Sequence, residues 1–303
     1  MEDLLGVSKE SVYRRIRGET QLSFAEVKKI CVHFNISVDA LINAQSDKGA
    51  LFQYKPLVIS DMDNYAAYMT FLLEKMNRVA NSTQEKELVF TAQDIPFYHF
   101  CKYPDLAFFK LYAWNDMLQH NAVTYEKFYD SLDKTGIVPI YEQIYQAYLC
   151  IPAIEIWAER TIDVTLRLLE YYFDTDRFDK KDTILFLLDR FVSLIDTIKH
   201  FADEGYKDIE REIPFSLFSC SVDLENNFML LKRGDHLACI LKLYAISRIM
   251  TDNESLCTET KIWIDSLISK SILISGNGAY RERLHFFNGL KTKIQEFEKR
   301  ISQ

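Results

Sequence analysis

The chain has 303 residues, of which 48% are hydrophobic and 26% charged, and its formal net charge is −8. This composition is typical of a soluble globular protein, and the length favours two domains. No apolar run approaches the roughly 18 residues that span a bilayer, and no basic start followed by an apolar segment resembles a signal peptide. We therefore expect a cytoplasmic protein with no membrane partner.

Enzyme signatures are missing from the sequence. The six cysteines are scattered without a Cys-x-x-Cys pair, which indicates reduced side chains rather than a metal site. The chain has no Gly-Lys-Ser/Thr phosphate loop, no His-Glu-x-x-His and no Gly-x-Ser-x-Gly. We expect no catalytic residues, no cofactor and no metal.

The segment from residue 4 to residue 18 is typical of the turn and second helix of a helix-turn-helix. Gly6 and Val7 suit the turn between two helices. Ser8 is a good N-cap, because its hydroxyl can accept a hydrogen bond from free amides of the first helical turn. Gly18 can end the helix in the left-handed conformation. The sequence therefore predicts a short helix between Ser8 and Gly18.

One side of this predicted helix is basic and aromatic. At about 100° per residue, Val12 and Ile16 fall on the other side, and we expect both to face a core. Such a helix fits the major groove of DNA. The residues within the outer arc of roughly 140° are Lys9, Glu10, Tyr13, Arg14 and Arg17.

The charge distribution makes a DNA contact compatible with an acidic protein. Residues 8–17 hold four cations and one anion, whereas residues 1–45 hold six of each. The excess negative charge therefore lies beyond residue 45, and only a local basic surface can meet DNA.

A second helix follows the first. Ser23 and Glu26 form a capping box, in which each side chain can bond to the other's free amide. Apolar residues at helical spacing continue to Phe34, and Ser37 suits the cap of a last short helix. We therefore assign residues 1–45 to a helix-turn-helix DNA-binding domain.

The pattern resembles the lambda-repressor-like, or XRE-type, helix-turn-helix family. The matching pieces are Leu-Gly-Val-Ser at 5–8, Arg-Gly-Glu at 17–19 and Phe-Asn-Ile-Ser-Val-Asp-Ala-Leu at 34–41. The whole architecture is similar to transcriptional regulators of Bacteroides-type bacteria. The resemblance implies a protein that regulates transcription by binding double-stranded DNA.

In this family, the residues that face base edges correspond here to Lys9, Glu10 and Arg14. The resemblance implies that Lys9 and Arg14 donate to guanine and that Glu10 accepts from cytosine. Tyr13 and Arg17 suit phosphate or thymine-methyl contacts, and Arg15, on the flank, suits a phosphate contact.

The sequence departs from the family pattern in two ways. The family has a full helix and most of another before Leu4, where this chain has Met1 to Asp3, so the first helix is apparently missing. A start further upstream, a clipped chain and a decayed domain are all open explanations. The family also places an apolar residue where Arg15 stands and a polar one where Ile16 stands.

The remainder of the chain predicts a linker at 46–62 and a helical dimerisation or sensor domain at 63–303. Helices are expected at 63–81, 104–119, 121–132, 137–150, 152–174, 180–204, 255–272 and 279–301. Strand candidates are 51–54 and 88–91, and a small antiparallel meander is expected within 215–243. The predicted fold class is mainly α, with a helix-turn-helix bundle and a larger helical domain that carries a small antiparallel β element.

Two questions of function stay open. A DNA-binding regulator is expected to be a homodimer, with an effector or protein partner for its helical domain. The alternative is a non-catalytic interaction or scaffold protein whose DNA-binding domain is degenerate. A further motif, the segment 275–278 followed by Arg281 and Arg283, suits either an anion site or a plain turn.

Overall fold

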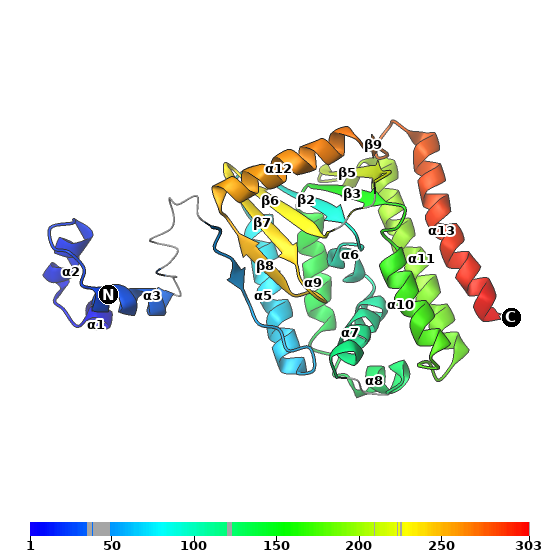
Figure 1. Cartoon of the computed structure of the whole chain (residues 1–303), viewed down its shortest axis with the longest axis horizontal. Helices are drawn as coiled ribbons and strands as arrows, with labels where there is room; N and C mark the ends of the chain where they lie inside the picture. The colour runs from blue at the N-terminus through cyan, green and yellow to red at the C-terminus, as the bar shows by residue number, and fades with distance from the viewer. Residues whose placement is uncertain are drawn as a thin grey trace. The chain divides into compact units, whose positions relative to one another are not determined.

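The computed structural model of the chain describes residues 1–34, 38, 49–119, 123–208, 210–222, 224 and 226–302. The chain divides into two compact units, Met1–Phe52 and Gln53–Gln303, whose elements are labelled in Figure 1. We refer to them as unit 1 and unit 2.

Unit 1 is a small helical unit. The helices among its described residues are α1 (Glu2–Leu5), α2 (Lys9–Ile16) and α3 (Phe24–Phe34). Within residues 1–34, the buried apolar side chains are Leu5, Val12 and Cys31, one from each helix, and α1 contacts α3. The helix predicted after Ser37 lies outside the described residues, apart from Val38.

Unit 2 is built on a mixed sheet. In the part of the chain that the structure describes, nine strands form one sheet in the order β1-β8-β7-β6-β2-β3-β5-β4, with β9 paired to β5. The β2–β3 and β3–β5 pairs are parallel, and the other pairs are antiparallel. The strands are β1 (Gln53–Tyr54), β2 (Lys86–Ala92), β3 (Ala153–Ala158), β4 (Tyr206–Asp208), β5 (Ile213–Cys220), β6 (Phe228–Arg233), β7 (His236–Lys242), β8 (Arg248–Thr251) and β9 (Ile272–Leu273).

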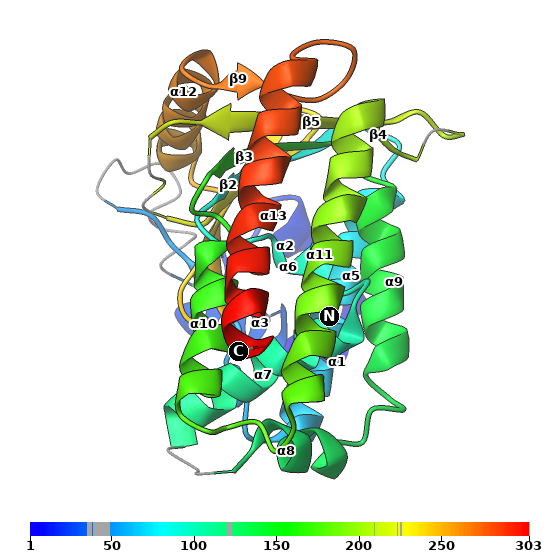
Figure 2. The same ribbon diagram turned by 90° about the vertical axis from the view of Figure 1, so that its right-hand side faces the viewer.

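The two faces of this sheet are covered unequally. One face packs against most of the helices, through side chains such as Phe90 and Trp157. The other face packs against α12, where Ile264 joins Val89 and Ile156 in a smaller cluster (Figure 1). Figure 2 shows α11 and α13 side by side, and the two helices are in contact.

The helices of unit 2 are α5 (Met62–Ala80), α6 (Phe97–Phe100), α7 (Pro104–Gln119), α8 (Tyr125–Ser131), α9 (Val138–Leu149), α10 (Asp163–Asp174), α11 (Lys181–Glu204), α12 (Glu254–Ser269) and α13 (Tyr280–Ser302). Most were predicted to within a few residues, because most have an apolar side at helical spacing, as the buried residues of α5 and α11 show. Within the described residues, none of the helices is both long enough and apolar enough to cross a membrane.

The predicted fold class was wrong. A mainly α fold with a small antiparallel element does not describe a large sheet whose centre contains the parallel strands β2, β3 and β5. The main cause is the segment 152–174, predicted as one helix, which contains both β3 and α10. Every residue of β3 except the half-buried Ile154 is buried, so the strand has no alternation of polar and apolar residues to reveal it.

Candidate nucleic-acid interface

Ser8 and Gly18 fix the two ends of α2, and Gly6 ends α1 in the turn before it, as the sequence predicted. Gly6 has φ 70° and Gly18 has φ 73°, both in the left-handed region. The Ser8 hydroxyl accepts from the backbone N–H of Ser11 at the start of the helix. At its end, the N–H of Gly18 donates to Arg15 O at 3.0 Å and the N–H of Glu19 donates to Arg14 O at 2.9 Å. This is a Schellman motif, which satisfies two free carbonyls.

The outer side of α2 is open to solvent. Five of the six predicted DNA-contacting residues are exposed: Lys9, Glu10, Tyr13, Arg14 and Arg17. Val12, on the opposite side, is buried. The exposed side thus presents three cations, one carboxylate and one aromatic ring, all of which can act as hydrogen-bond or stacking partners for a nucleic acid.

Glu19, which was not among the predicted contact residues, pairs with two of these cations. Its carboxylate lies 2.8 Å from Nε of Arg17 and 3.6 Å from Nε of Arg14. The Schellman turn brings Glu19 back toward the helix that precedes it. The signal in the sequence was its place directly after Gly18. Exposed ion pairs of this kind are weak, so a phosphate can displace the carboxylate.

Arg15 lies apart from the other predicted contact residues. Its side chain is 17% exposed, and its Nη2 lies 2.8 Å from Oε1 of Glu26 on α3. Its Nη1 also donates to Ser11 O at 3.1 Å. The structure therefore engages Arg15 in the packing of α2 against α3 rather than on the exposed side.

Glu26 also forms the predicted capping box. Its Oε2 accepts from the backbone N–H of Ser23 at 2.8 Å, while the Ser23 hydroxyl accepts from the N–H of Glu26 at 3.3 Å. The Ser23 hydroxyl also donates to the same Oε2 at 2.9 Å. The backbone N–H of Ser23, then its hydroxyl, and then Arg15 lower the pKa of the Glu26 carboxyl. A charged Glu26 therefore serves α3 as a cap and α2 as an ion-pair partner.

The expected inner position of Ile16 was wrong. Ile16 is 69% exposed, whereas Val12 is 7% exposed. Arg15 takes the inner place beside Val12 because its guanidinium is held by Glu26, and Ile16, one residue further round, is left outside. Phe24 and Phe34, the first and last residues of the apolar side predicted for α3, are also exposed, whereas Cys31 is buried.

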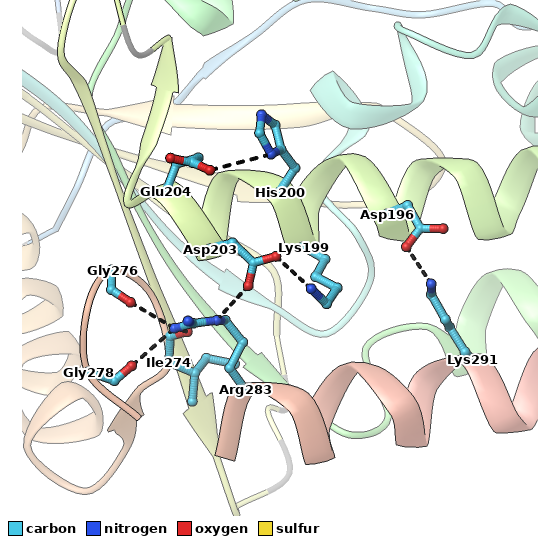
Figure 3. A network of polar contacts seen from close by, with 10 residues as sticks. All are labelled: Asp196, Lys199, His200, Asp203, Glu204, Ile274, Gly276, Gly278, Arg283 and Lys291. Carbon is cyan, nitrogen blue, oxygen red and sulfur yellow. Dashed lines mark hydrogen bonds and ion pairs between the residues drawn. The ribbon is translucent and has the colours of Figure 1, made fainter. Parts of the chain in front are cut away.

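The segment at 275–278 forms a turn organised by Arg283. Figure 3 shows the Arg283 guanidinium pointing into this turn, where Nη1 donates to the carbonyl oxygens of Ile274, Gly276 and Gly278 at 2.9–3.0 Å. Its Nε donates to Asp203 at 2.8 Å. An anion site would need the Arg283 guanidinium to bind the anion. Because the guanidinium already binds these protein oxygens, the contacts favour the plain turn.

The comparisons with known proteins concern mainly the first part of the chain. A family model described as the BetR domain matches residues 1–83, a range that includes all of α1, α2, α3 and α5. No curated protein and no solved structure matches the chain. The likeness to the BetR domain suggests a DNA-binding regulator of the Bacteroides type.

Proposed function

We propose that this protein is a sequence-specific transcriptional regulator of the XRE type, in which α2 enters the major groove of double-stranded DNA. The observation that carries the proposal is the exposed side of α2, where Lys9, Glu10 and Arg14 stand on a helix fixed at both ends. The similarity of residues 1–83 to the BetR domain supports it. The proposal includes no catalytic step.

Lys9 and Arg14 are the residues proposed to read guanine, and Glu10 the residue proposed to read cytosine. A bidentate contact of this kind discriminates against a wrong base pair by about 1–3 kcal/mol. Tyr13 and Arg17 are proposed to contact the DNA backbone, which positions the helix without reading sequence.

We further propose that the protein binds DNA as a homodimer. A single small module buries only about 600–1,000 Å² on DNA. Two linked modules gain affinity because the second contact becomes intramolecular. Sizing in solution at micromolar concentration tests this step, and a monomer bound one-to-one on DNA would contradict it.

Selection of bound duplexes from a random DNA pool tests the main proposal. We expect a defined motif for the full chain. Arg14→Ala should weaken binding to that motif by about ten- to a hundredfold and relax one position, as expected for the loss of one base contact. Glu10→Ala should alter base preference more than affinity.

Arg281→Ala is the matched control, because Arg281 is exposed and lies on α13. It should bind the selected motif like the wild type. Equal binding of all sequences by the wild type and both α2 variants would overturn the proposal and favour an interaction protein instead.

A further inference from the structure

Unit 2 contains a cavity of about 80 Å³ at the carboxyl end of β2. The cavity is lined by β2 and the segment after it, together with residues of α7, β6, β7 and β8. On one side β2 forms a parallel pair with β3, and on the other side it forms an antiparallel pair with β6. The carboxyl end of a parallel strand, where the sheet topology changes, is a common place for a ligand site.

Most of the cavity wall is apolar. The aromatic and aliphatic side chains that line it include Phe90, Phe97, Phe100, Trp114, Met229 and Ile240. A wall of this kind excludes water from an apolar ligand body. It also lowers the local dielectric constant, which strengthens the hydrogen bonds and ion pairs of each polar group in the wall.

Three cations and one carboxylate line the same cavity. Asp94 is buried, and its Oδ2 lies 2.9 Å from Nζ of Lys110 and 3.1 Å from Nζ of Lys242. Burial would raise the pKa of the Asp94 carboxyl, but the two ammonium groups lower it to about 2. Asp94 is therefore an anion that two lysines share.

Arg248 supplies the third cation, and the described residues offer it no carboxylate. Its Nη1 donates to the hydroxyl of Tyr98 at 3.0 Å, and a tyrosine hydroxyl is neutral at ordinary pH. Arg248 is half-buried, and partial desolvation of a guanidinium favours an anionic partner. Among the described residues that line the cavity, three basic side chains thus accompany a single carboxylate, although burial lowers the pKa of the Lys110 ammonium.

We propose that this cavity binds a small organic carboxylate, with the carboxylate on Arg248 and Lys242 and a short apolar body against the aromatic wall. Guanidinium and carboxylate groups match in shape and charge, which favours a carboxylate over a neutral ligand. An apolar cavity of about 150 Å³ holds benzene. The smaller volume here therefore indicates an aliphatic body of about three to five carbons.

Calorimetric titration of the full chain with sodium butyrate and sodium isovalerate tests the proposal. We expect saturable binding of at least one of these probes. Butyramide, which has the same body without the charge, should bind at least tenfold more weakly, and butylammonium should not bind. No saturable binding of either carboxylate at millimolar concentration, or equal binding of butyrate and butyramide, would overturn the proposal.

Variants locate the site. Arg248→Met and Lys242→Met should each weaken carboxylate binding at least tenfold, whereas Arg281→Met, which removes an exposed arginine outside the cavity, should not change it. If Arg248→Met fails to fold, Lys242→Met alone tests the position of the site. The Lys242 side chain is one-third exposed, so we expect this variant to fold. Wild-type affinity in a folded cavity variant would contradict the assignment. The test uses no DNA, so it is independent of the proposed regulatory function.

Discussion

Arg15 on α2 and Glu26 on α3 form an ion pair of 2.8 Å whose side chains are mostly buried. The same carboxylate caps α3 through Ser23. A single carboxylate therefore sets the start of one helix and the attachment of the other. Because α2 carries the proposed base-reading residues, this pair fixes their orientation relative to the rest of unit 1.

A double-mutant cycle measures this coupling. Arg15→Met and Glu26→Gln should each lower the hydrogen-exchange protection of the α3 amides, because each variant leaves its partner without the ion pair. The double variant should lose less than the sum of the two single losses. Strictly additive losses would show that the pair does not couple the helices.

Neutralising Glu19 should tighten DNA binding. Glu19→Gln removes the carboxylate that pairs with Arg14 and Arg17, and leaves both guanidinium groups free for DNA. We expect about two- to fivefold higher affinity at low salt, in line with the weakness of exposed pairs. Fluorescence anisotropy with a labelled duplex measures the change.

Asp3→Asn is the control for Glu19→Gln, because it changes the net charge equally at an exposed position of α1. An equal gain in both variants would mean that net charge, rather than release of the arginines, causes the effect.

Lys207 should make stability depend on pH near neutrality. Burial lowers the pKa of its ammonium from 10.5 to about 7, although Glu155 acts in the opposite direction. Between these two pKa values the unfolded chain binds more protons than the folded chain, so the free energy of unfolding should rise with pH. The slope from this group approaches about 1.4 kcal/mol per pH unit.

Denaturant unfolding between about pH 7 and pH 8.5 checks this rise, since the range stays below the ordinary cysteine pKa of 9.0. Lys207→Met should flatten the dependence. The same slope in Lys207→Met and in the wild type would assign the effect to another group.

Arg283 should be needed for the stability of unit 2. Arg283→Lys keeps the charge but cannot reach Asp203 and three carbonyl oxygens at once. Buried acceptors left without a donor cost about 1–3 kcal/mol, and chemical denaturation should show a loss of that size. Arg281→Lys, at an exposed position of the same helix, should leave the midpoint unchanged.

Features that depend on near neighbours in the chain could be predicted from the residues alone. The capping box of Ser23 and Glu26, the left-handed conformation at Gly18 and, to within one residue, the bounds of α11 were predicted correctly. Each follows from hydrogen bonds or side-chain periodicity within a few residues, which sequence patterns record directly.

Tertiary structure decided what depends on distant segments. The strands β2, β3 and β5 meet in parallel although helices separate them in the chain, and the burial of β3 removed the alternation that marks a strand. On α2, Arg15 pairs with Glu26, eleven residues away, whereas Ile16 beside it is exposed. Likewise Asp94, Lys110, Lys242 and Arg248 meet at one cavity only because the sheet and α7 bring them together.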